Sequence, residues 1–557
     1  MKTLKKFFVG LLAVAMSFSL AACSSGEKTT TTDTPTTDGE TTTETAYKTT
    51  FTYAVGGEPN YLDPAIGSDS VTTFITNQIY FPLFYIGTDG SMVNAACTGY
   101  DVSEDGLTYT LHLTEDNYWS DGQQVTASDY IYGMKHALNL GSADSTYVFF
   151  ITDNVEGAAE LEGKPTAEMD SLGITAPDDF TIEFKLKKLC PYFDSLLAAG
   201  VFYPAREEFV KDGDYTWADD ASVPYNGPFH PTAIDRASEI VMERNEYFVN
   251  NTDNEIVVEK IIAKTMPDMD AELMAFQTGE IDFATAVDPA TVYNLYNGKD
   301  ELEAIDSVIN YYVMFNCSDV GGANEALKDA NVRKAIAYAI DRDQIVTALD
   351  AGDVYYPLYG YVPKGFAGNT GDFREEGGDL VGYDPEMSKQ LLADAGFDES
   401  NPLELTYYYN QNTMHDTVAA VLKSELAKVN VNLTLKTGEI RTFFADRNDG
   451  LFELARGAMS ADYMDVRTFL DMALSSYQAT PTWGDATYDQ MIADTDLLTG
   501  AERIDALHAA EEYLVGEQVY TLPLFGYKNV CLKKAGTTGQ LGSPQGNYVF
   551  WYVHVPE

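Results

Sequence analysis

The chain has 557 residues, 45% of them hydrophobic, which is more than one hydrophobic core usually organises, so we expect two or three lobes. Its 86 Asp and Glu residues against 35 Lys and Arg residues give a formal charge of -51, which repels nucleic acid and anionic lipid. Neither is therefore an expected ligand, and we attribute the acidity to surface solubility rather than to a cationic substrate.

The first 22 residues have the features of a bacterial lipoprotein signal peptide. Three lysines precede an apolar run from Phe7 that is too short to span a bilayer and ends in Leu20-Ala21-Ala22-Cys23. We expect cleavage before Cys23, lipidation of Cys23 and a location on the outer face of the cell membrane, held by the lipid alone. The alternative is an uncleaved anchor helix.

The next segment, residues 23–46, consists mostly of Thr, Ser, Asp, Glu and Gly. This composition buries too little apolar surface to fold, so we expect a disordered linker between the lipid and the folded part. A protein tethered outside a membrane in this way typically captures a solute for a partner in that membrane.

Three patterns predict local structure in the first half of the folded part. Glu104-Asp105-Gly106 indicates a turn before a strand, because glycine adopts positive φ at no steric cost. Ser128 or Asp129 is expected to cap the helix that follows. The alternation of apolar and polar residues in Phe180–Leu186 predicts a half-buried strand.

Further along, Asp384, Pro385 and Glu386 predict a helix start, and Gly396 predicts its end. Val431–Lys436 alternates like a second half-buried strand. Helices between strands favour a mixed α/β protein over a helical bundle or a β-sandwich. An amphipathic helix is also expected, with an apolar face of Val332, Ile336, Ala339 and Ile340 and a solvent face of Arg333, Lys334 and Asp341.

The cysteines beyond Cys23 are widely spaced and include no C-x-x-C pair, so no metal or redox motif is visible. Two disulfides and four isolated, partly buried thiols are both compatible with this spacing, and we favour the thiols. The four residues are Cys97, Cys190, Cys317 and Cys531.

An enzyme is the main alternative class. The six histidines form no H-E-x-x-H motif, and G-x-S-x-G, G-x-x-x-x-G-K-[ST] and G-x-G-x-x-G are absent from the sequence. Asp268-Met269-Asp270 and Asp494-Thr495-Asp496 lack the glycine and the terminal Glu of a calcium loop. We expect no catalytic residue, no metal site and no cofactor. A hydrolase whose catalytic residues lie far apart in sequence remains the alternative.

Several short motifs follow one another along almost the whole folded part. They are Gly57–Pro59 with Leu62–Pro64, Val102–Leu111, Trp119–Gly122 with Val125–Asp129, Tyr225–Phe229, Asn331–Ala335 with Ala339–Arg342, and Ala461–Tyr463 with Thr468–Leu470. In this order they resemble the oligopeptide-binding and dipeptide-binding lipoproteins of ABC importers, which are family 5 extracellular solute-binding proteins. The family also includes receptors for nickel and some sugars.

The resemblance implies a periplasmic-binding-protein-like α/β fold, in which two main mixed α/β lobes are joined by a two-strand hinge and accompanied by an extra subdomain. It places lobe I at residues 46–80, 204–310 and 525–557, the subdomain at 81–203, and lobe II at 311–524. The hinge is expected near Tyr311–Val313 and Leu522–Leu524. We expect a monomer that captures short peptides between its lobes and delivers them to an ABC permease, whose separate ATPase subunits bind the ATP.

In similar receptors the ligand lies extended between the lobes, and charge-assisted hydrogen bonds fix its termini. Asp462 matches the acid that holds the amino group of the ligand, and Arg456 and Arg447 match basic positions near the ligand or its carboxylate. In a straight strand Arg456 and Asp462 share a face and lie at most roughly 20 Å apart, although Gly457 permits a bend. The alternative is that Asp462 and Arg456 pair with neighbouring charges of the protein.

Four further residues complete the candidate contacts that follow the family pattern. His415 matches a histidine that reaches the ligand carboxylate in some relatives, and its alternative is a helix-start residue that faces solvent. Tyr527 matches a tyrosine that contacts the peptide backbone. Ser460, two residues before the key acid, and Ser70, in a segment expected to face the ligand, are also candidates.

Two positions depart from the family pattern. Ile440 stands after Glu439 where relatives often have Trp, and Met459 stands where an aromatic residue follows the arginine motif. Met459 is kept as a candidate ligand contact. The smaller walls favour aliphatic ligand side chains or another solute, such as nickel, haem or an oligosaccharide. The 37 tyrosines of the chain, Tyr407–Tyr409 among them, are an alternative source of aromatic walls.

Overall fold

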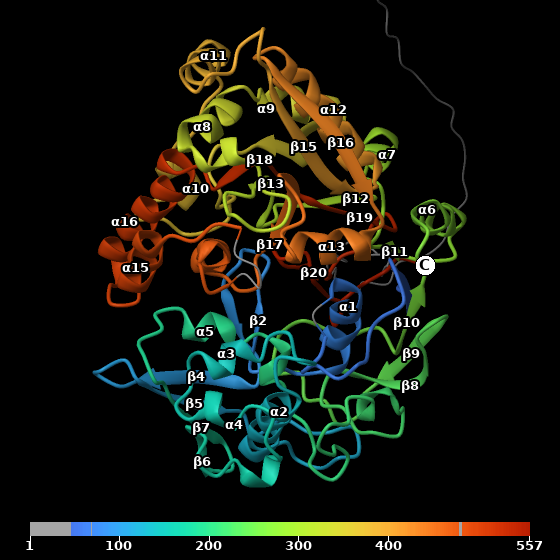
Figure 1. Cartoon of the computed structure of the whole chain (residues 1–557). Coiled ribbons are helices and arrows are strands. Elements are labelled where there is room, and N and C mark those ends of the chain that lie inside the picture. Colours follow the sequence, from blue (N-terminus) through green and yellow to red (C-terminus); the bar gives the residue numbers. More distant parts are fainter. Residues whose placement is uncertain (1–45, 68, 478–481) are drawn as a thin grey trace, which may run out of the picture. The chain divides into compact units, whose positions relative to one another are not determined.

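The computed structural model describes residues 46–67, 69–477 and 482–557, and within them the strands form three larger sheets and two hairpins (Figure 1). The first sheet pairs β1 in parallel with β10, Phe51 opposite Ile261, and continues to β9 and β8 by antiparallel pairing. Its strands, in spatial order, are β12 (Leu302–Ile305), β19 (Asn529–Lys533), β11 (Phe283–Ala284), β1 (Thr50–Val55), β10 (Lys260–Thr265), β9 (Glu239–Arg244) and β8 (Phe229–Asp235).

The second sheet carries the candidate arginine on a central strand. β13 pairs antiparallel with β17 so that Val313 lies opposite Arg456, and the register runs without a shift from Ile309 to Phe315. Its strands, in spatial order, are β14 (Tyr355–Pro357), β18 (Thr521–Tyr527), β13 (Ile309–Phe315), β17 (Leu454–Ser460), β15 (Leu403–Asn410) and β16 (Val431–Gly438).

The smaller sheet units lie in the expected subdomain and near the carboxyl end. The third sheet consists of β4 (Cys97–Val102), β5 (Thr108–Leu113), β7 (Thr181–Lys185) and β6 (Ile174–Asp178), in this order. The hairpins are β2 (Phe84–Ile86) with β3 (Met92–Asn94), and β20 (Leu541–Gly542) with β21 (Tyr548–Val549).

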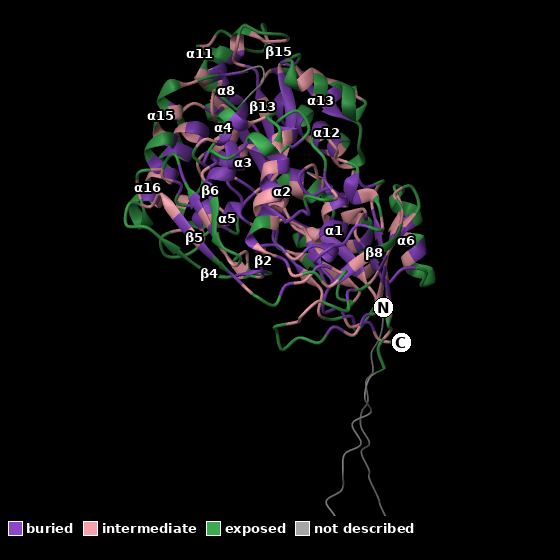
Figure 2. Cartoon of the chain, turned by 90° about the horizontal axis from the view of Figure 1, so that it is seen from below, coloured by how far each residue is buried: buried purple, intermediate pink, exposed green. Residues whose placement is uncertain are grey.

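Helices accompany each sheet, and the buried residues gather on the strands and on the helix faces that cover them (Figure 2). In chain order they are α1 (Ser70–Ile79), α2 (Ala127–Leu140), α3 (Phe149–Thr152), α4 (Ala158–Leu161), α5 (Phe193–Leu196), α6 (Met269–Thr278), α7 (Pro289–Tyr296), α8 (Ala330–Tyr338), α9 (Arg342–Leu349), α10 (Phe373–Gly377), α11 (Pro385–Asp394), α12 (Thr413–Ala427), α13 (Ile440–Asn448), α14 (Arg467–Leu470), α15 (Ala486–Thr495) and α16 (Gly500–Glu511). Among the described residues, no helix combines the length and apolar character that a membrane span requires.

The chain passes from the first sheet to the second through Asp306–Val308 and returns through Lys528. The residues expected for the hinge, Tyr311–Val313 and Leu522–Leu524, lie inside β13 and β18, a few positions from these crossings. The mixed α/β class is confirmed. The division into lobes with the expected boundaries stays a prediction.

Most local predictions are confirmed. Asp384 accepts a hydrogen bond from the backbone of Met387 at the start of α11, and Gly396 has φ of 91° after its end. Gly106 has φ of 71° before β5, and the strands expected at residues 180–186 and 431–436 are β7 and β16. The four cysteines among the described residues are free thiols, and Cys317 is the most exposed of them.

Two local predictions are wrong. The N-cap of α2 is Thr126, and Asp129 completes the capping box from the third helical position instead of capping the helix itself. Arg333 does not face solvent: it is 2% exposed, and its guanidinium donates to the carbonyls of Leu327 and Gln518. Burial is tolerated because these carbonyls end short helical turns and need donors.

The Leu62-Asp63-Pro64 motif has a structural role in this fold. The fully buried carboxylate of Asp63 accepts a hydrogen bond of 2.9 Å from the Trp217 indole and lies 2.6 Å from Nε2 of His136 in α2. It also accepts from the backbone of Ala65 at 3.0 Å. A buried carboxylate needs such partners, so this motif fastens α2 to the segment that leads into α1.

Candidate ligand-binding site

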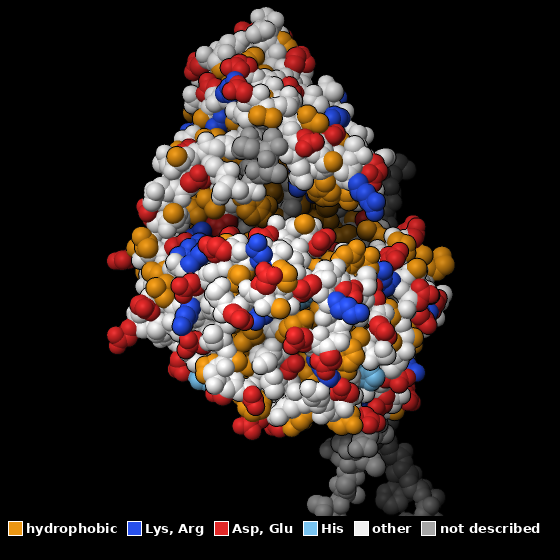
Figure 3. Space-filling model, turned by 60° about the horizontal axis from the view of Figure 1, so that its bottom comes forward, with side chains coloured by type: hydrophobic (Ala, Val, Ile, Leu, Met, Phe, Trp, Pro, Cys, Tyr) orange, Lys and Arg blue, Asp and Glu red, His pale blue; other side chains and the backbone are white. Residues whose placement is uncertain are grey.

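A cavity of about 270 Å³ opens where separate parts of the described chain meet. α1 contributes Ser70, the segment before α3 contributes Tyr147, and the residues after β17 contribute Ser460 and Asp462. Gln545, between β20 and β21, lines another side and donates a hydrogen bond of 2.9 Å to the backbone just before the aspartate. Figure 3 shows a hollow on one face with hydrophobic side chains around it.

Asp462 is a partly buried carboxylate that forms no ion pair with any Lys, Arg or His that the structure describes. Its Oδ1 accepts a hydrogen bond of 3.0 Å from the hydroxyl of Tyr147, and its backbone N–H donates to Oγ1 of Thr468 at 3.0 Å. Burial raises the pKa of Asp462 to about 6, and the Tyr147 hydrogen bond acts in the opposite direction. A carboxylate in this position favours a cationic ligand group, which would restore its lost electrostatic stabilisation.

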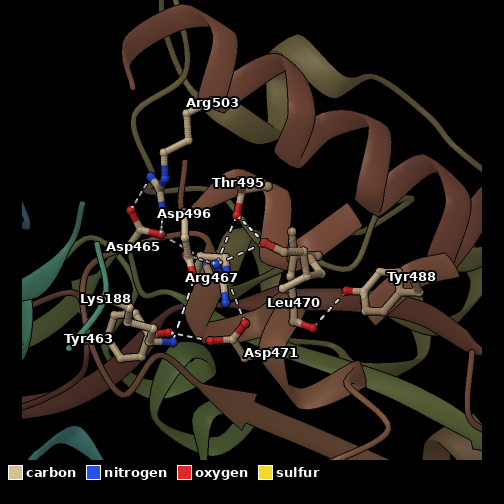
Figure 4. Close-up of polar contacts among 11 residues, drawn as sticks. Lys188, Tyr463, Asp465, Arg467, Leu470, Asp471, Tyr488, Thr495, Asp496 and Arg503 are labelled. Carbon is tan, nitrogen blue, oxygen red and sulfur yellow. Dashed lines mark hydrogen bonds and ion pairs between the residues drawn. The ribbon is translucent and has the colours of Figure 1, made fainter. Parts of the chain in front are cut away.

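An ion network fixes the chain segment that follows β17 (Figure 4). Arg467 is buried, and its guanidinium donates to Asp471 at 2.7 Å and to Asp496. Arg503 holds Asp465 with two hydrogen bonds of 2.7 and 2.8 Å. Arg467, on α14, contacts Thr495 of α15, and Arg503 lies on α16, so the loop between β17 and α14 that carries the candidate acid is held in place.

Residues from the expected subdomain contact the segment that follows β17 and the end of α15. The ring of Tyr192 stacks on Tyr463 with centroids 5.2 Å apart and lies 5.6 Å from the guanidinium carbon of Arg467. Lys188 approaches Asp496 to 3.8 Å. These contacts join two chain parts that the sequence places about 270 residues apart, on one side of the cavity.

Two arginines lie on the other side of the candidate acid, toward the start of β17. Nε of Arg456 donates to Oδ1 of Asn410 at 2.8 Å, and its guanidinium carbon lies 5.4 Å from the ring of Phe443. Arg447, on α13, lies 4.9 Å from the ring of Phe444. Within the described residues neither arginine forms an ion pair with a carboxylate. Arg456 is 8% exposed and lines neither the cavity of about 270 Å³ nor a second cavity against β13, and Arg447 does not line the first one, so what these arginines offer a ligand is an uncompensated positive charge.

The family comparison identifies the chain. The model of the bacterial extracellular solute-binding proteins, family 5 (middle part), matches residues 91–481. The chain belongs to this family. It is 29% identical to the dipeptide-binding protein DppE of Bacillus subtilis over 558 aligned positions, which cover 98% of each chain. It is 27% identical to the periplasmic oligopeptide-binding protein OppA of Escherichia coli, with 89% of this chain and 90% of the relative covered.

A solved structure shares the fold. The OppA protein of Listeria monocytogenes, whose structure is bound to peptide, superposes with a TM-score of 0.73 at 22% sequence identity. The superposition covers 92% of this chain and 99% of that protein. The periplasmic-binding-protein-like fold expected of a family 5 protein is thus confirmed.

His415 and Tyr527 lie near Arg456, and both side chains are uncharged at neutral pH. Nδ1 of His415 lies 3.2 Å from the hydroxyl of Tyr311, and burial beside Arg456 lowers the pKa of His415 to about 4. Burial raises the pKa of Tyr527 to about 12, with Arg456 acting in the opposite direction. At pH 7 both side chains can exchange hydrogen bonds but neither contributes a charge. His415 is 5% exposed, so it is not a solvent-facing helix start.

Of the remaining candidate ligand contacts, two line the first cavity and one lies in the hydrophobic core. Ser70 and Ser460 line the first cavity, whereas Met459 is 9% exposed and packs in the hydrophobic core around the second sheet. Met459 lies outside the residues that line the cavity. Cys23 lies outside the described residues.

Gly457 does not bend β17 away from its partner, because the pairing with β13 continues through it. Its role is spatial: a Cβ at this position would lie 2.3 Å from the ring of Tyr312, which crosses the strand here. Asp462 lies in a bend two residues after β17 ends, so the shared face expected of Arg456 and Asp462 stays a prediction.

Sequence reasoning missed several residues of the site. Tyr147 lies 315 positions from Asp462, and no sequence signal joins them. Phe443 could have been found, because it precedes Arg447 by four residues on a helix, the spacing at which side chains meet. The alternative, in which Asp462 and Arg456 pair with neighbouring charges of the protein, is not supported, because neither residue forms an ion pair among the described residues.

Proposed function

We propose that this chain is the lipid-anchored receptor of an ABC importer and that it captures short peptides outside the cell membrane and delivers them to a permease. One observation carries the proposal. A partly buried carboxylate without a basic partner lies just after β17, and two arginines without an acidic partner lie on β17 and on α13. A free peptide has the complementary charges, an ammonium at one end and a carboxylate at the other.

In this proposal Asp462 binds the amino group, and Arg456 and Arg447 bind the carboxylate. The six-residue step from Arg456 to Asp462 spans roughly 20 Å at most, which is an upper limit on the distance between the two residues and does not fix the length of the peptide. Ser70 and Ser460 supply hydroxyls along the cavity, and neutral His415 and Tyr527 supply hydrogen bonds near the arginines. Met459 supports the strand from the core side.

The names of the relatives support this ligand class. The two curated relatives are named for dipeptides and oligopeptides, and the Listeria protein is described with peptide bound. Their names describe solute-binding proteins and not enzymes, and we infer binding without turnover for this chain as well. Intact recovery of a peptide after incubation is the expected result, and loss of its mass would favour the hydrolase alternative.

Delivery requires a change of shape that the topology permits. We infer that the two large sheets belong to separate lobes, which close over the ligand by rotation at Asp306–Val308 and Lys528. The closed form of a monomer would then dock on the permease, with ATP bound by the separate ATPase subunits. Lipid on Cys23 and the linker of residues 23–46 would keep the receptor at the outer face of the membrane.

The first test compares a tripeptide with two blocked forms of the same tripeptide. N-acetylation removes the ammonium that Asp462 would bind, and C-terminal amidation removes the carboxylate that the arginines would bind. Each change is expected to weaken binding by about 30-fold or more in titration calorimetry, because it leaves a protein charge buried and unpaired. A capped peptide that binds as well as the free one would remove the site assignment. Tight binding of nickel, haem or an oligosaccharide instead would favour another ligand class.

The affinity of the free tripeptide is expected to fall as the pH drops through about 6. Below that pH Asp462 takes up a proton and loses its attraction for the ammonium, at about tenfold in affinity per pH unit. Tyr147→Phe removes a hydrogen bond that lowers the pKa of Asp462, so the midpoint should move to higher pH. Calorimetry between pH 4.5 and 8 gives both midpoints. A flat profile, or a midpoint that Tyr147→Phe moves downward, contradicts this role of the carboxylate.

A further inference from the structure

A second cavity of about 260 Å³ lies against β13, on the side of the sheet where the ring of Tyr312 crosses Gly457. Its walls come from β13, from the loop after α14 and from the start of β18. They are mostly aromatic or apolar, and Tyr312, Tyr361, Trp483, Tyr520, Met472 and Ala473 carry the argument.

The aromatic side chains that form the walls pack against one another. Trp483 stacks on Tyr520 with ring centroids 4.2 Å apart and an angle of 12°, and Tyr312 meets Tyr361 edge to face at 5.0 Å. Trp483 is 8% exposed and Tyr312 is 6% exposed. Side chains fixed in this way form a preorganised surface, which costs a ligand little ordering.

The cavity is lined by Arg447 itself and by a tyrosine that senses the charge of Asp462. Tyr477 lines it and lies close enough to Asp462 for the carboxylate to help raise the pKa of Tyr477 to about 12, after burial. Arg447 lines it as well and is close enough to Arg456 for the second charge to lower its own pKa further, beyond the effect of burial. A group entering the cavity would therefore project from a peptide that runs between these charges.

The size and the polarity of the cavity limit which ligand group can enter it. Sites for whole small molecules usually measure roughly 300–1,000 Å³, so this cavity is suited to a part of a ligand. Arg447 is the only Lys, Arg, Asp or Glu among the described residues that line it. An ammonium or a carboxylate in its depth would lack a partner, whereas an aromatic or large aliphatic group would replace water on apolar walls.

We propose that this cavity is a specificity pocket for one large apolar side chain of the ligand, preferably aromatic, so that the receptor selects peptides that carry such a residue. The inference rests on the proposed peptide binding and adds a preference to it. Positions 440 and 459 lack the aromatic residues that relatives have there. The pocket would replace them with aromatic walls from other parts of the sequence, namely Tyr312, Tyr361 and Trp483.

The test uses the full chain without its signal peptide and a set of tripeptides that differ from Ala-Ala-Ala at one position. Each position in turn carries Gly, Leu, Phe, Asp or Lys, and calorimetry gives the affinities. At one position Phe is expected to bind about 10- to 100-fold more tightly than Gly, the range expected for full burial of such a side chain. Asp and Lys at that position should bind more weakly than Gly.

Ala473→Leu fills the pocket from its wall, and the affinity ratio of Phe over Gly should then fall by at least tenfold. Ala473→Ser, which adds little volume, is the matched control and should keep the ratio. The thermal midpoint of each variant shows that it is folded. Trp483 fluorescence supplies a second readout, because the Phe peptide should change it and the Gly peptide should change it less.

The outcomes separate the two proposals. If tripeptides bind but no position prefers Phe, or if Ala473→Leu leaves the preference intact, the pocket assignment is overturned and peptide binding stands. If no tripeptide binds at all, the proposed function fails and the pocket inference fails with it.

Discussion

Asp462→Asn is expected to weaken the binding of a free tripeptide by 100-fold or more while leaving the protein at least as stable as the parent. The first effect follows because the ammonium of the ligand would enter a buried site that holds a neutral amide instead of a carboxylate. Loss of one partner of a buried charge pair costs roughly 2–5 kcal/mol. The Tyr147 hydroxyl can still donate to the amide oxygen, so the wall of the cavity keeps its hydrogen bond.

The second effect follows from the raised pKa. In the folded chain burial lifts the pKa of Asp462 from its ordinary value of 3.8 to about 6, so the folded form holds the proton more tightly than the unfolded form. The stability that this provides is complete below pH 4 and is lost as the pH rises through 6. At pH 7 the difference corresponds to as much as about 3 kcal/mol, which Asn would recover.

Two measurements check this pair of expectations. Calorimetry gives the affinity, and denaturation at pH 7 and pH 4 gives the free energy of unfolding, with the gain from Asn expected at pH 7 and absent at pH 4. Asp144→Asn, an exposed aspartate outside both cavities, is the control and should change neither quantity by much. Parent-like affinity of Asp462→Asn would show that the amino group of the ligand binds elsewhere.

The parts of the fold that local chemistry determines could be predicted from the sequence. Asp384 and Pro385 fix the start of α11 because a capping carboxylate and a fixed φ act within one turn. The alternating strand β16 depends only on which residues face the core. Arg333 shows where this reasoning ends, because its burial depends on the carbonyl of Gln518, 185 positions later.

The candidate site divides in the same way. The place of Arg456 on β17 follows from the strand pattern, whereas Asp462 lies in a bend two residues after the strand ends. The pKa of Asp462 could not be predicted from the sequence either, because it depends on burial and on a hydrogen bond from a tyrosine of a distant segment. The aromatic pocket is likewise not predictable from the sequence, because its walls come from five stretches of chain that periodicity cannot bring together. Motif order was enough to indicate the family, whereas the proposed ligand preference depends on tertiary contacts.

Arg467→Met is expected to lower the free energy of unfolding by about 3–5 kcal/mol at pH 7. Arg467 is 4% exposed, and its guanidinium donates to Asp471, to Asp496 and to Oγ1 of Thr495 (Figure 4). Methionine fills similar space but leaves two carboxylates in a poorly solvated place without their cation. Breaking a buried pair by removing one partner is costly for this reason, whereas an exposed pair contributes roughly 0–1 kcal/mol.

The loss from Arg467→Met should also depend on pH, and the sign can be derived. Burial already raises the pKa of Asp471, and Arg467 opposes that rise. Without the arginine the pKa rises further, so the folded variant gains stability as the pH falls and the carboxyl takes up a proton. The deficit relative to the parent should therefore shrink from pH 7 to pH 5. Urea denaturation at pH 7 and pH 5 measures the deficit. Lys389→Met, which breaks an exposed ion pair with Glu386, is the control.

Because the network around Arg467 holds the loop that carries Asp462, the affinity of Arg467→Met for a tripeptide should fall as well. A deficit below 1 kcal/mol at pH 7, or one that grows toward pH 5, would contradict this account of the buried network.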